Sequence, residues 1–302
     1  SGIAHASILQ GLEVLLIDQN IKAAEAGKAK IEILLSESVK RKKLSEEEKI
    51  RLLKKVKTDA SLENISSSDL VIEAVFEDLN LKHNLYKKIE PHLKEGAILA
   101  SNTSTLPITK LSEVLADSTR FLGIHFFSPV DKMNLVELIK SERTNDNALA
   151  VALDYTSLIK KTPIVVNDSR GFYANRCIIP YINEGLRMLN EGIEPALIEN
   201  SAKQIGMPVG PLQLLDELSV SLALNVAKET KEALGTKYEE TGTENILLEM
   251  SQKNRLGRKE LAGFYEYDEK GRRLKLWEGL RNLCLLYTSP SPRDRTRSRM
   301  PS

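Results

Sequence analysis

The sequence predicts an α/β protein in which a doubly wound, mostly parallel sheet is followed by an all-helical domain. Two observations predict this fold class. Up to residue 168, short runs of Val, Ile and Leu alternate with segments of helical periodicity, a pattern typical of strands that crossover helices cover on both faces. Beyond that residue the strand-like runs stop, and apolar side chains recur every three or four positions, as on one face of a helix. We therefore expect domains at 1–168 and 169–284.

The expected strands of the first domain are near-continuous apolar runs at 12–18, 70–75, 97–102, 121–127, 135–140 and 162–167. Helical patterns occupy the gaps between them. One begins with a capping box, Ser45-x-x-Glu48, which satisfies free N–H groups at a helix start. In this helix the apolar residues lie three positions apart, at Ile50, Leu53 and Val56. In a second helix they lie four positions apart, at Leu81, Leu85, Ile89 and Leu93.

The second domain begins with a long amphipathic helix that contains Pro180. One face of it carries Ala174, Cys177, Ile178, Tyr181, Ile182, Gly185, Met188 and Leu189. A second helix is expected from Pro195 to Gly206, because proline suits a first helical turn and glycine suits a helix end.

The composition excludes several classes of protein. The chain has 302 residues, 41% of them hydrophobic, and 43 Lys and Arg against 42 Asp and Glu leave a net charge of +1. A nearly neutral chain has no overall basic field for nucleic acid, and no apolar run approaches the roughly 20 residues of a membrane span. Two cysteines, Cys177 and Cys284, offer no metal-ligand spacing and favour a reducing, cytoplasmic compartment. We expect no metal site.

Both ends of the chain are unusual. The first residues have the pattern of a helix that began earlier, and there is no initiating methionine. The composition changes abruptly at residues 285–302, which are rich in Ser, Pro and Arg. Such a segment has no periodicity that could bury a face. We expect a non-native, non-globular tail, the alternative being a basic arm that is phosphorylated or binds nucleic acid.

A dinucleotide fingerprint is suggested by Gly2 at the start of the first helix and Asp18 at the end of the first strand, sixteen residues later. In that fingerprint the third glycine allows close helix–strand packing, and an acidic residue about 20 residues after the first glycine binds a ribose hydroxyl. The two earlier glycines would precede residue 1. One Gly and one Asp also fit an ordinary helix–strand unit, and both interpretations stay open at this point.

Polar residues gather where several expected strands end. Glu77 follows one strand, Asn102 and Ser104 follow the next, and His125 lies near the end of a third. Ligands bind at this edge of an open parallel sheet, although Ser, Asn and His also form ordinary turns. Glu137 lies inside the apolar run LVELIK, and a buried carboxylate needs a partner such as an imidazole. His125 and Glu137 are therefore a candidate catalytic pair.

Longer segments resemble the L-3-hydroxyacyl-CoA dehydrogenase family: IEAVFEDLNLK (72–82), ILASNTSTLPI (98–108), GIHFFSPVDKMNLVELI (123–139), PIVVNDSRGFYANR (163–176) and GMPVGPLQLLDEL (206–218). The resemblance covers the chain from Gly2 to about residue 283. It implies a Rossmann-type domain whose first strand is truncated, a helical substrate domain, and NAD-dependent oxidation of (S)-3-hydroxyacyl-CoA in fatty-acid β-oxidation.

The resemblance also assigns roles to individual residues. It implies that His125 is the catalytic base, that Glu137 orients it, and that Ser104 and Asn175 lie at the substrate. Asp18 would bind the adenosine ribose and favour NAD over NADP, because its charge repels a 2′-phosphate. The implied cofactor-binding residues are Gly2, Asp18, Val75, Phe76, Glu77, Lys82, Asn102, Ser104 and Ser128. Many monofunctional relatives carry Asn where this chain has Ser128, whereas the β-oxidation α subunits also carry serine.

The segments SPVDKM, PYINEGLRML and RKELAGFYEYDEKGRR are most similar to the α subunit of the multifunctional β-oxidation complex. That similarity implies a bacterial parent with a preceding enoyl-CoA hydratase domain and a thiolase β subunit as partner, of which this chain is an internal fragment. A stand-alone 3-hydroxybutyryl-CoA dehydrogenase is the main alternative. A non-catalytic, crystallin-like relative and an inactive fragment with weak NAD binding and poor stability are the others.

Overall fold

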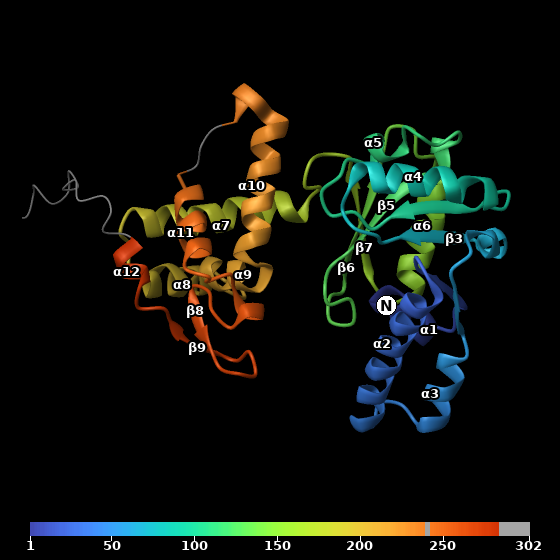
Figure 1. Cartoon of the computed structure of the whole chain (residues 1–302), viewed down its shortest axis with the longest axis horizontal. Helices are drawn as coiled ribbons and strands as arrows, with labels where there is room; N and C mark the ends of the chain where they lie inside the picture. Colours follow the sequence, from blue (N-terminus) through green and yellow to red (C-terminus); the bar gives the residue numbers. More distant parts are fainter. Residues whose placement is uncertain (239–241, 284–302) are drawn as a thin grey trace, which may run out of the picture. The chain divides into compact units, whose positions relative to one another are not determined.

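The computed structural model describes residues 1–238 and 242–283, and the chain divides into two compact units at Asn175 and Arg176 (Figure 1). The first unit is a layered α/β structure and the second is mainly helical. The predicted fold class is thus confirmed. The expected non-native tail and Cys284 lie outside the described residues. Within those residues, no helix combines the length and the apolar character that a membrane crossing needs.

The main sheet of the first unit has five strands in the order β3-β4-β5-β6-β7. All neighbours are parallel except β5 and β6, which are antiparallel. The bounds are β3 (Leu70–Glu73), β4 (Ile98–Ser101), β5 (Phe121–Phe126), β6 (Leu135–Lys140) and β7 (Thr162–Asn167). A separate parallel pair contains β1 (Val14–Ile17) and β2 (Val56–Asp59).

Strand β2 corrects one sequence expectation. The capping box at Ser45 and Glu48 is present with both reciprocal hydrogen bonds, but its helix, α3 (Glu46–Leu53), ends before Val56. Val56 instead pairs with Val14 and is 1% exposed. The run VKTD contains a single apolar residue, so only pairing with a distant strand reveals it as a strand.

Helices cover both faces of the five-stranded sheet (Figure 1). On one face α4 (Leu79–Ile89) and α5 (Ile108–Ser112) pack against β4 and β5, with the rings of Tyr86 and Phe121 5.3 Å apart. On the other face, α6 (Asp146–Leu158) places Ala148 and Ala152 against residues such as Ile124. The pair β1-β2 packs against α1 (Gly2–Leu9), α2 (Ile21–Lys40) and α3. Apolar side chains on both faces explain the near-continuous apolar runs.

The second unit has a core of buried residues that includes Leu186, Leu212 and Phe264. Its expected first two helices are present, with Pro180 inside the first and Gly206 at φ +97° shortly after the second. The helices are α7 (Ala174–Asn190), α8 (Pro195–Gln204), α9 (Pro211–Leu218), α10 (Val220–Leu234), α11 (Glu244–Gln252) and α12 (Leu280–Leu283). Short 3-10 turns lie at Leu62–Ser67, Glu90–His92, Ser118–Arg120, Gly235–Lys237 and Arg258–Glu260.

The second unit is mainly helical, as expected, but it also contains a small hairpin that the sequence did not predict. Its strands are β8 (Tyr265–Tyr267) and β9 (Arg273–Leu276). The buried carboxylate of Asp216 holds the hairpin, because it accepts hydrogen bonds from the N–H of Phe264, the N–H of Tyr265 and the hydroxyl of Tyr267. Three residues are too short a run for a sequence pattern.

Candidate active site

The register of two neighbouring strands brings His125 and Glu137 together. His125 on β5 lies directly opposite Glu137 on β6 in the antiparallel ladder, and directly opposite side chains project on the same face. Nδ1 of His125 is 2.7 Å from Oε2 of Glu137. Both residues are buried, at 5% and 0% exposed, so water competes little for this hydrogen bond.

Glu137 remains ionised despite its burial. Its Oε1 accepts hydrogen bonds from the N–H groups of Tyr173, at 2.9 Å, and Ala174, at 2.8 Å. Burial alone would raise the pKa of Glu137, but the hydrogen bonds from His125, Ala174 and Tyr173 lower it below its ordinary value. An ionised carboxylate can only accept, so Nδ1 of His125 carries the proton. In the neutral ring, Nε2 then has a free lone pair and can act as a base.

Two aromatic rings contact the imidazole. The ring centroid of His125 is 4.6 Å from that of Phe127 and 6.0 Å from that of Phe172, and both pairs are tilted. Phe172 is 1% exposed. Together with the Nδ1 hydrogen bond, these contacts fix the plane of the imidazole.

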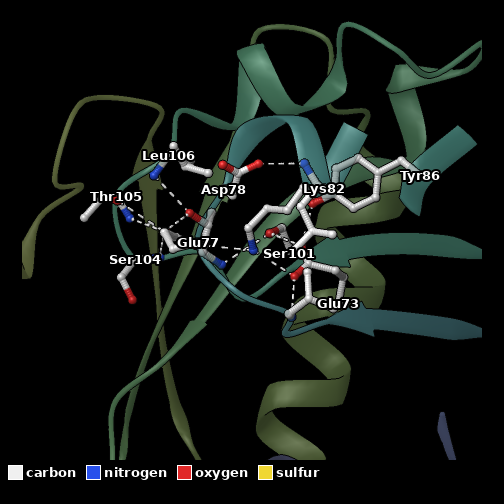
Figure 2. Close-up of polar contacts among 12 residues, drawn as sticks. Glu73, Glu77, Asp78, Lys82, Tyr86, Ser101, Ser104, Thr105 and Leu106 are labelled. Atoms are coloured by element: carbon white, nitrogen blue, oxygen red, sulfur yellow. Dashed lines mark hydrogen bonds and ion pairs between the residues drawn. The ribbon is translucent and has the colours of Figure 1, made fainter. Parts of the chain in front are cut away.

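The loop after β4 carries Ser104, and Glu77 holds it in place (Figure 2). Oε1 of Glu77 accepts hydrogen bonds from the Thr103 hydroxyl, at 2.5 Å, and from the N–H groups of Ser104 and Thr105, at 2.9 and 3.0 Å. Burial by itself raises the pKa of Glu77. These hydrogen bonds and the charge of Lys82 lower it by more, so the pKa lies below its ordinary value. The loop around Ser104 is therefore built on an ionised carboxylate.

Asn102 and Asn175 connect this loop to its surroundings. Oδ1 of Asn102 accepts a hydrogen bond from the N–H of Phe126, at 2.9 Å, next to His125. Nδ2 of Asn175 donates to the carbonyl oxygen of Ser104, at 3.2 Å. The first unit thus connects Asn102, Ser104, Asn175 and the His125 strand in one hydrogen-bonded region.

A buried cluster lies beneath the loop (Figure 2). Nζ of the fully buried Lys82 is 2.7 Å from Oε1 of Glu73 and 3.2 Å from Oε2 of Glu77. The other oxygen of Glu73 accepts from the hydroxyls of Tyr86, at 2.6 Å, and Ser101, at 2.8 Å. Burial, followed by the charge of Glu73, raises the pKa of Tyr86. The ammonium of Lys82 therefore faces protein carboxylates.

Sequence reasoning missed Asp168 as a member of this region and used it only as a boundary. Its two oxygens accept hydrogen bonds from the N–H groups of Ile108, at 2.8 Å, and Thr109, at 2.7 Å. A carboxylate there stabilises the start of α5. The only sequence signal was an acidic residue after a strand. Glu73, the buried partner of Lys82, and Tyr86, which donates to Glu73, were missed for the same reason, because their contacts join different elements.

Several of the residues expected to hold a dinucleotide are accessible to such a ligand, whereas Lys82, which is 0% exposed, is not. Helix α1 begins at Gly2, where an added Cβ would come within 3.1 Å of Val130, and its first N–H groups form a favourable site for phosphate. Asp18 follows β1 directly and is exposed. Val75 and Phe76 follow β3 and are 41% and 79% exposed, so apolar surface is available for a base. Ser128 is also exposed.

Comparison with known proteins identifies the family. Residues 1–169 match the NAD binding domain of 3-hydroxyacyl-CoA dehydrogenase, and residues 171–267 match its C-terminal domain. This chain belongs to the 3-hydroxyacyl-CoA dehydrogenase family. It is accordingly an NAD-dependent 3-hydroxyacyl-CoA dehydrogenase, an oxidoreductase of fatty-acid metabolism.

Solved structures of this dehydrogenase family include both stand-alone and multifunctional enzymes. (S)-3-hydroxybutyryl-CoA dehydrogenase PaaH1 from Ralstonia eutropha is 36% identical with a TM-score of 0.82, and the match covers 89% of this chain and 95% of that one. FadB2 from M. tuberculosis is 31% identical with a TM-score of 0.82, covering 88% and 94%. The dehydrogenase part of multifunctional enzyme 1 from C. elegans is 26% identical with a TM-score of 0.65, covering 96% and 65%.

Proposed function

We propose that this dehydrogenase oxidises (S)-3-hydroxyacyl-CoA to 3-ketoacyl-CoA in fatty-acid β-oxidation, with His125 as the base and Glu137 as the residue that orients it. The supporting observation is the buried hydrogen bond of 2.7 Å between Nδ1 of His125 and Oε2 of Glu137. It fixes the proton on Nδ1 and leaves Nε2 as the only basic atom of the ring.

In the proposed reaction, Nε2 of His125 removes the proton of the substrate 3-hydroxyl. NAD, when bound, supplies the acceptor for the hydride that leaves the same carbon. The imidazole becomes positively charged as it takes the proton, and the carboxylate of Glu137 stabilises that charge, as in a catalytic triad. General-base assistance of this kind contributes about 10²–10⁴ in rate.

Ser104 and Asn175 are proposed to bind the substrate. Ser104 is exposed on a loop that Glu77 holds rigid, and a hydroxyl can donate to a carbonyl or hydroxyl oxygen. The amide of Asn175 is hydrogen-bonded to the same loop. Both groups are polar, neutral and close to the strand that carries His125, which suits a thioester or ketone oxygen.

The proposed cofactor residues contribute in two ways. Gly2, Asp18, Val75 and Phe76 are proposed to contact the dinucleotide directly, and Asn102, Ser104 and Ser128 are proposed to lie at its reacting end. Glu77 and Lys82 contribute from within the protein, because Nζ of Lys82 is buried between two carboxylates and Glu77 binds the Ser104 loop.

We further propose that the chain is the dehydrogenase part of a multifunctional α subunit that also carries an enoyl-CoA hydratase domain and associates with a thiolase β subunit. The SPVDKM segment and the likeness to the C. elegans multifunctional enzyme favour this proposal. The R. eutropha enzyme, at 36% identity, favours a stand-alone 3-hydroxybutyryl-CoA dehydrogenase. The coding sequence upstream of residue 1 distinguishes the two: a hydratase domain supports the first, and a nearby start methionine supports the second.

The experiment that tests the proposed reaction compares wild type, His125→Gln and His92→Gln. NADH consumption with acetoacetyl-CoA measures turnover, and NADH fluorescence measures cofactor binding. We expect His125→Gln to lose about two to four orders of magnitude in turnover and to bind NADH almost normally. His92→Gln, which changes a histidine in a 3-10 turn, should resemble wild type. Near-normal turnover of His125→Gln would refute the assignment.

A further inference from the structure

The turn between β7 and α7 has an unusual backbone. Gly171 has φ +73° and Phe172, immediately after it, has φ +50°. Glycine adopts this left-handed region freely, but a bulky residue with a side chain does so at a cost. Phe172 is also 1% exposed, so its ring is fixed by packing while its backbone is strained. Such strain persists only where the surroundings impose it, and it is concentrated at functional sites.

The left-handed turn aims the next two N–H groups at one atom. Tyr173 and Ala174 both donate to Oε1 of Glu137, at 2.9 and 2.8 Å. That oxygen is thereby occupied, and Oε2 is left for Nδ1 of His125. The same turn brings the Phe172 ring to 6.0 Å from the imidazole. One strained turn thus contacts both members of the pair.

We propose that the Gly171–Phe172 turn is a positioning element of the His125–Glu137 pair, which it orients by occupying one carboxylate oxygen with two backbone N–H groups. This inference rests on the proposed function, in which His125 is the base. Without the two donors the carboxylate can rotate about its last bond and offer either oxygen to the imidazole. The orientation of the His125 ring is then no longer fixed by Glu137, and Nε2 is no longer held toward the substrate.

The test uses two substitutions of equal size and hydrophobicity. Phe172→Leu and Phe172→Ile both replace the ring with a side chain of four carbons, but only Ile is branched at Cβ and is strongly disfavoured at positive φ. We expect Phe172→Ile to have a kcat at least about tenfold below that of Phe172→Leu, with KM values for NADH and acetoacetyl-CoA within about twofold. Thermal melts of both variants establish that they are folded.

A double-mutant cycle separates positioning from general stability. Both substitutions are repeated in a Glu137→Gln background, in which the proposed route of action is already broken. If the turn acts through Glu137, the tenfold ratio between Leu and Ile falls to less than about twofold there. Equal kcat values in the original background, or an undiminished ratio in the Glu137→Gln background, would overturn the inference.

Amide hydrogen exchange provides a readout that needs neither turnover nor a folded Phe172→Ile variant. The N–H groups of Tyr173 and Ala174 should exchange slowly in wild type and at least about tenfold faster in Glu137→Ala, because their acceptor is removed. Unchanged exchange in Glu137→Ala would refute the role of the turn. Absence of turnover in wild type would instead refute the proposed function, while the exchange result would still report on the turn.

Discussion

Replacing Glu137 by Gln should abolish the base without changing the number of side-chain heavy atoms in the core. Oε1 of Glu137 faces two N–H donors, from Tyr173 and Ala174, so the carbonyl oxygen of Gln must occupy that position. The opposite orientation would point an NH₂ group at both donors. The NH₂ group of Gln therefore faces Nδ1 of His125, which must now accept, and the imidazole proton moves to Nε2.

The size of the effect follows from the loss of the basic nitrogen. A neutral imidazole protonated on Nε2 cannot take the substrate proton, so the general-base contribution of about 10²–10⁴ is lost. That factor corresponds to about 3–5 kcal/mol of activation free energy. KM for NADH should change little, because no described contact joins Glu137 to the proposed cofactor residues.

The assay is NADH consumption with acetoacetyl-CoA, with kcat and KM measured separately. Glu142→Gln is the matched control, since Glu142 is exposed in the turn that follows the same strand, and it should behave like wild type. A kcat for Glu137→Gln within tenfold of wild type would refute the tautomer argument.

A second measurement is the pH dependence of the free energy of unfolding. The pKa of Glu137 is lowered from its ordinary value of 4.5, so the ionised carboxylate stabilises the fold at pH values above 4.5. This stability is lost as pH falls through the folded-state pKa, and Glu137→Gln should not show that loss.

Three further predictions concern other parts of the protein. Lys82→Met leaves the buried carboxylate of Glu73 and the partly exposed carboxylate of Glu77 without their cation. It should lower the free energy of unfolding, measured by urea titration, by about 3–5 kcal/mol. Lys94→Met, which breaks the exposed pair with Asp69, should lower it by less than about 1 kcal/mol. Burial raises the pKa of Asp216 from 3.8 to about 6. Its ionisation should therefore lower the free energy of unfolding by about 3 kcal/mol. This stability is lost as pH rises from about 4 through 6. Asp216→Asn should not show that loss, and identical pH dependence of urea unfolding in the two proteins would contradict the argument. Asp18→Ala should weaken NAD binding and reduce the preference for NAD over NADP, as measured by calorimetry with both dinucleotides; an unchanged preference would exclude Asp18 from the ribose site.

Local pattern was sufficient for most of the fold. The six apolar runs of the first domain correspond to β1, β3, β4, β5, β6 and β7, because a strand buried on both faces must be apolar along its length. The capping box at Ser45 was equally local. Pattern failed at β2 and at the β8-β9 hairpin, where strands of three or four residues depend on pairing with a partner rather than on their own composition.

Within the candidate site, sequence singled out His125 and Glu137 for a physical reason. A carboxylate inside an apolar strand has a high desolvation cost, and this cost implied a partner before any distance was known. The hydrogen bonds of Lys82 and Asp168 gave no comparable signal. Each depends on groups from other elements, such as Glu73 on β3 for Lys82 and the first N–H groups of α5 for Asp168.

The sequence by itself determined six strands of the first domain, the change to helices after it, the family, and the residue types available for dehydrogenation, since these follow from periodicity and motif. The tertiary structure decided what those residues do to one another. The antiparallel register of β5 and β6 sets His125 against Glu137, and a left-handed turn at Gly171 and Phe172 supplies the donors that hold Glu137. Hydrogen bonding requires positions within a few tenths of an ångström, and only the packed chain sets atoms from distant segments to that tolerance.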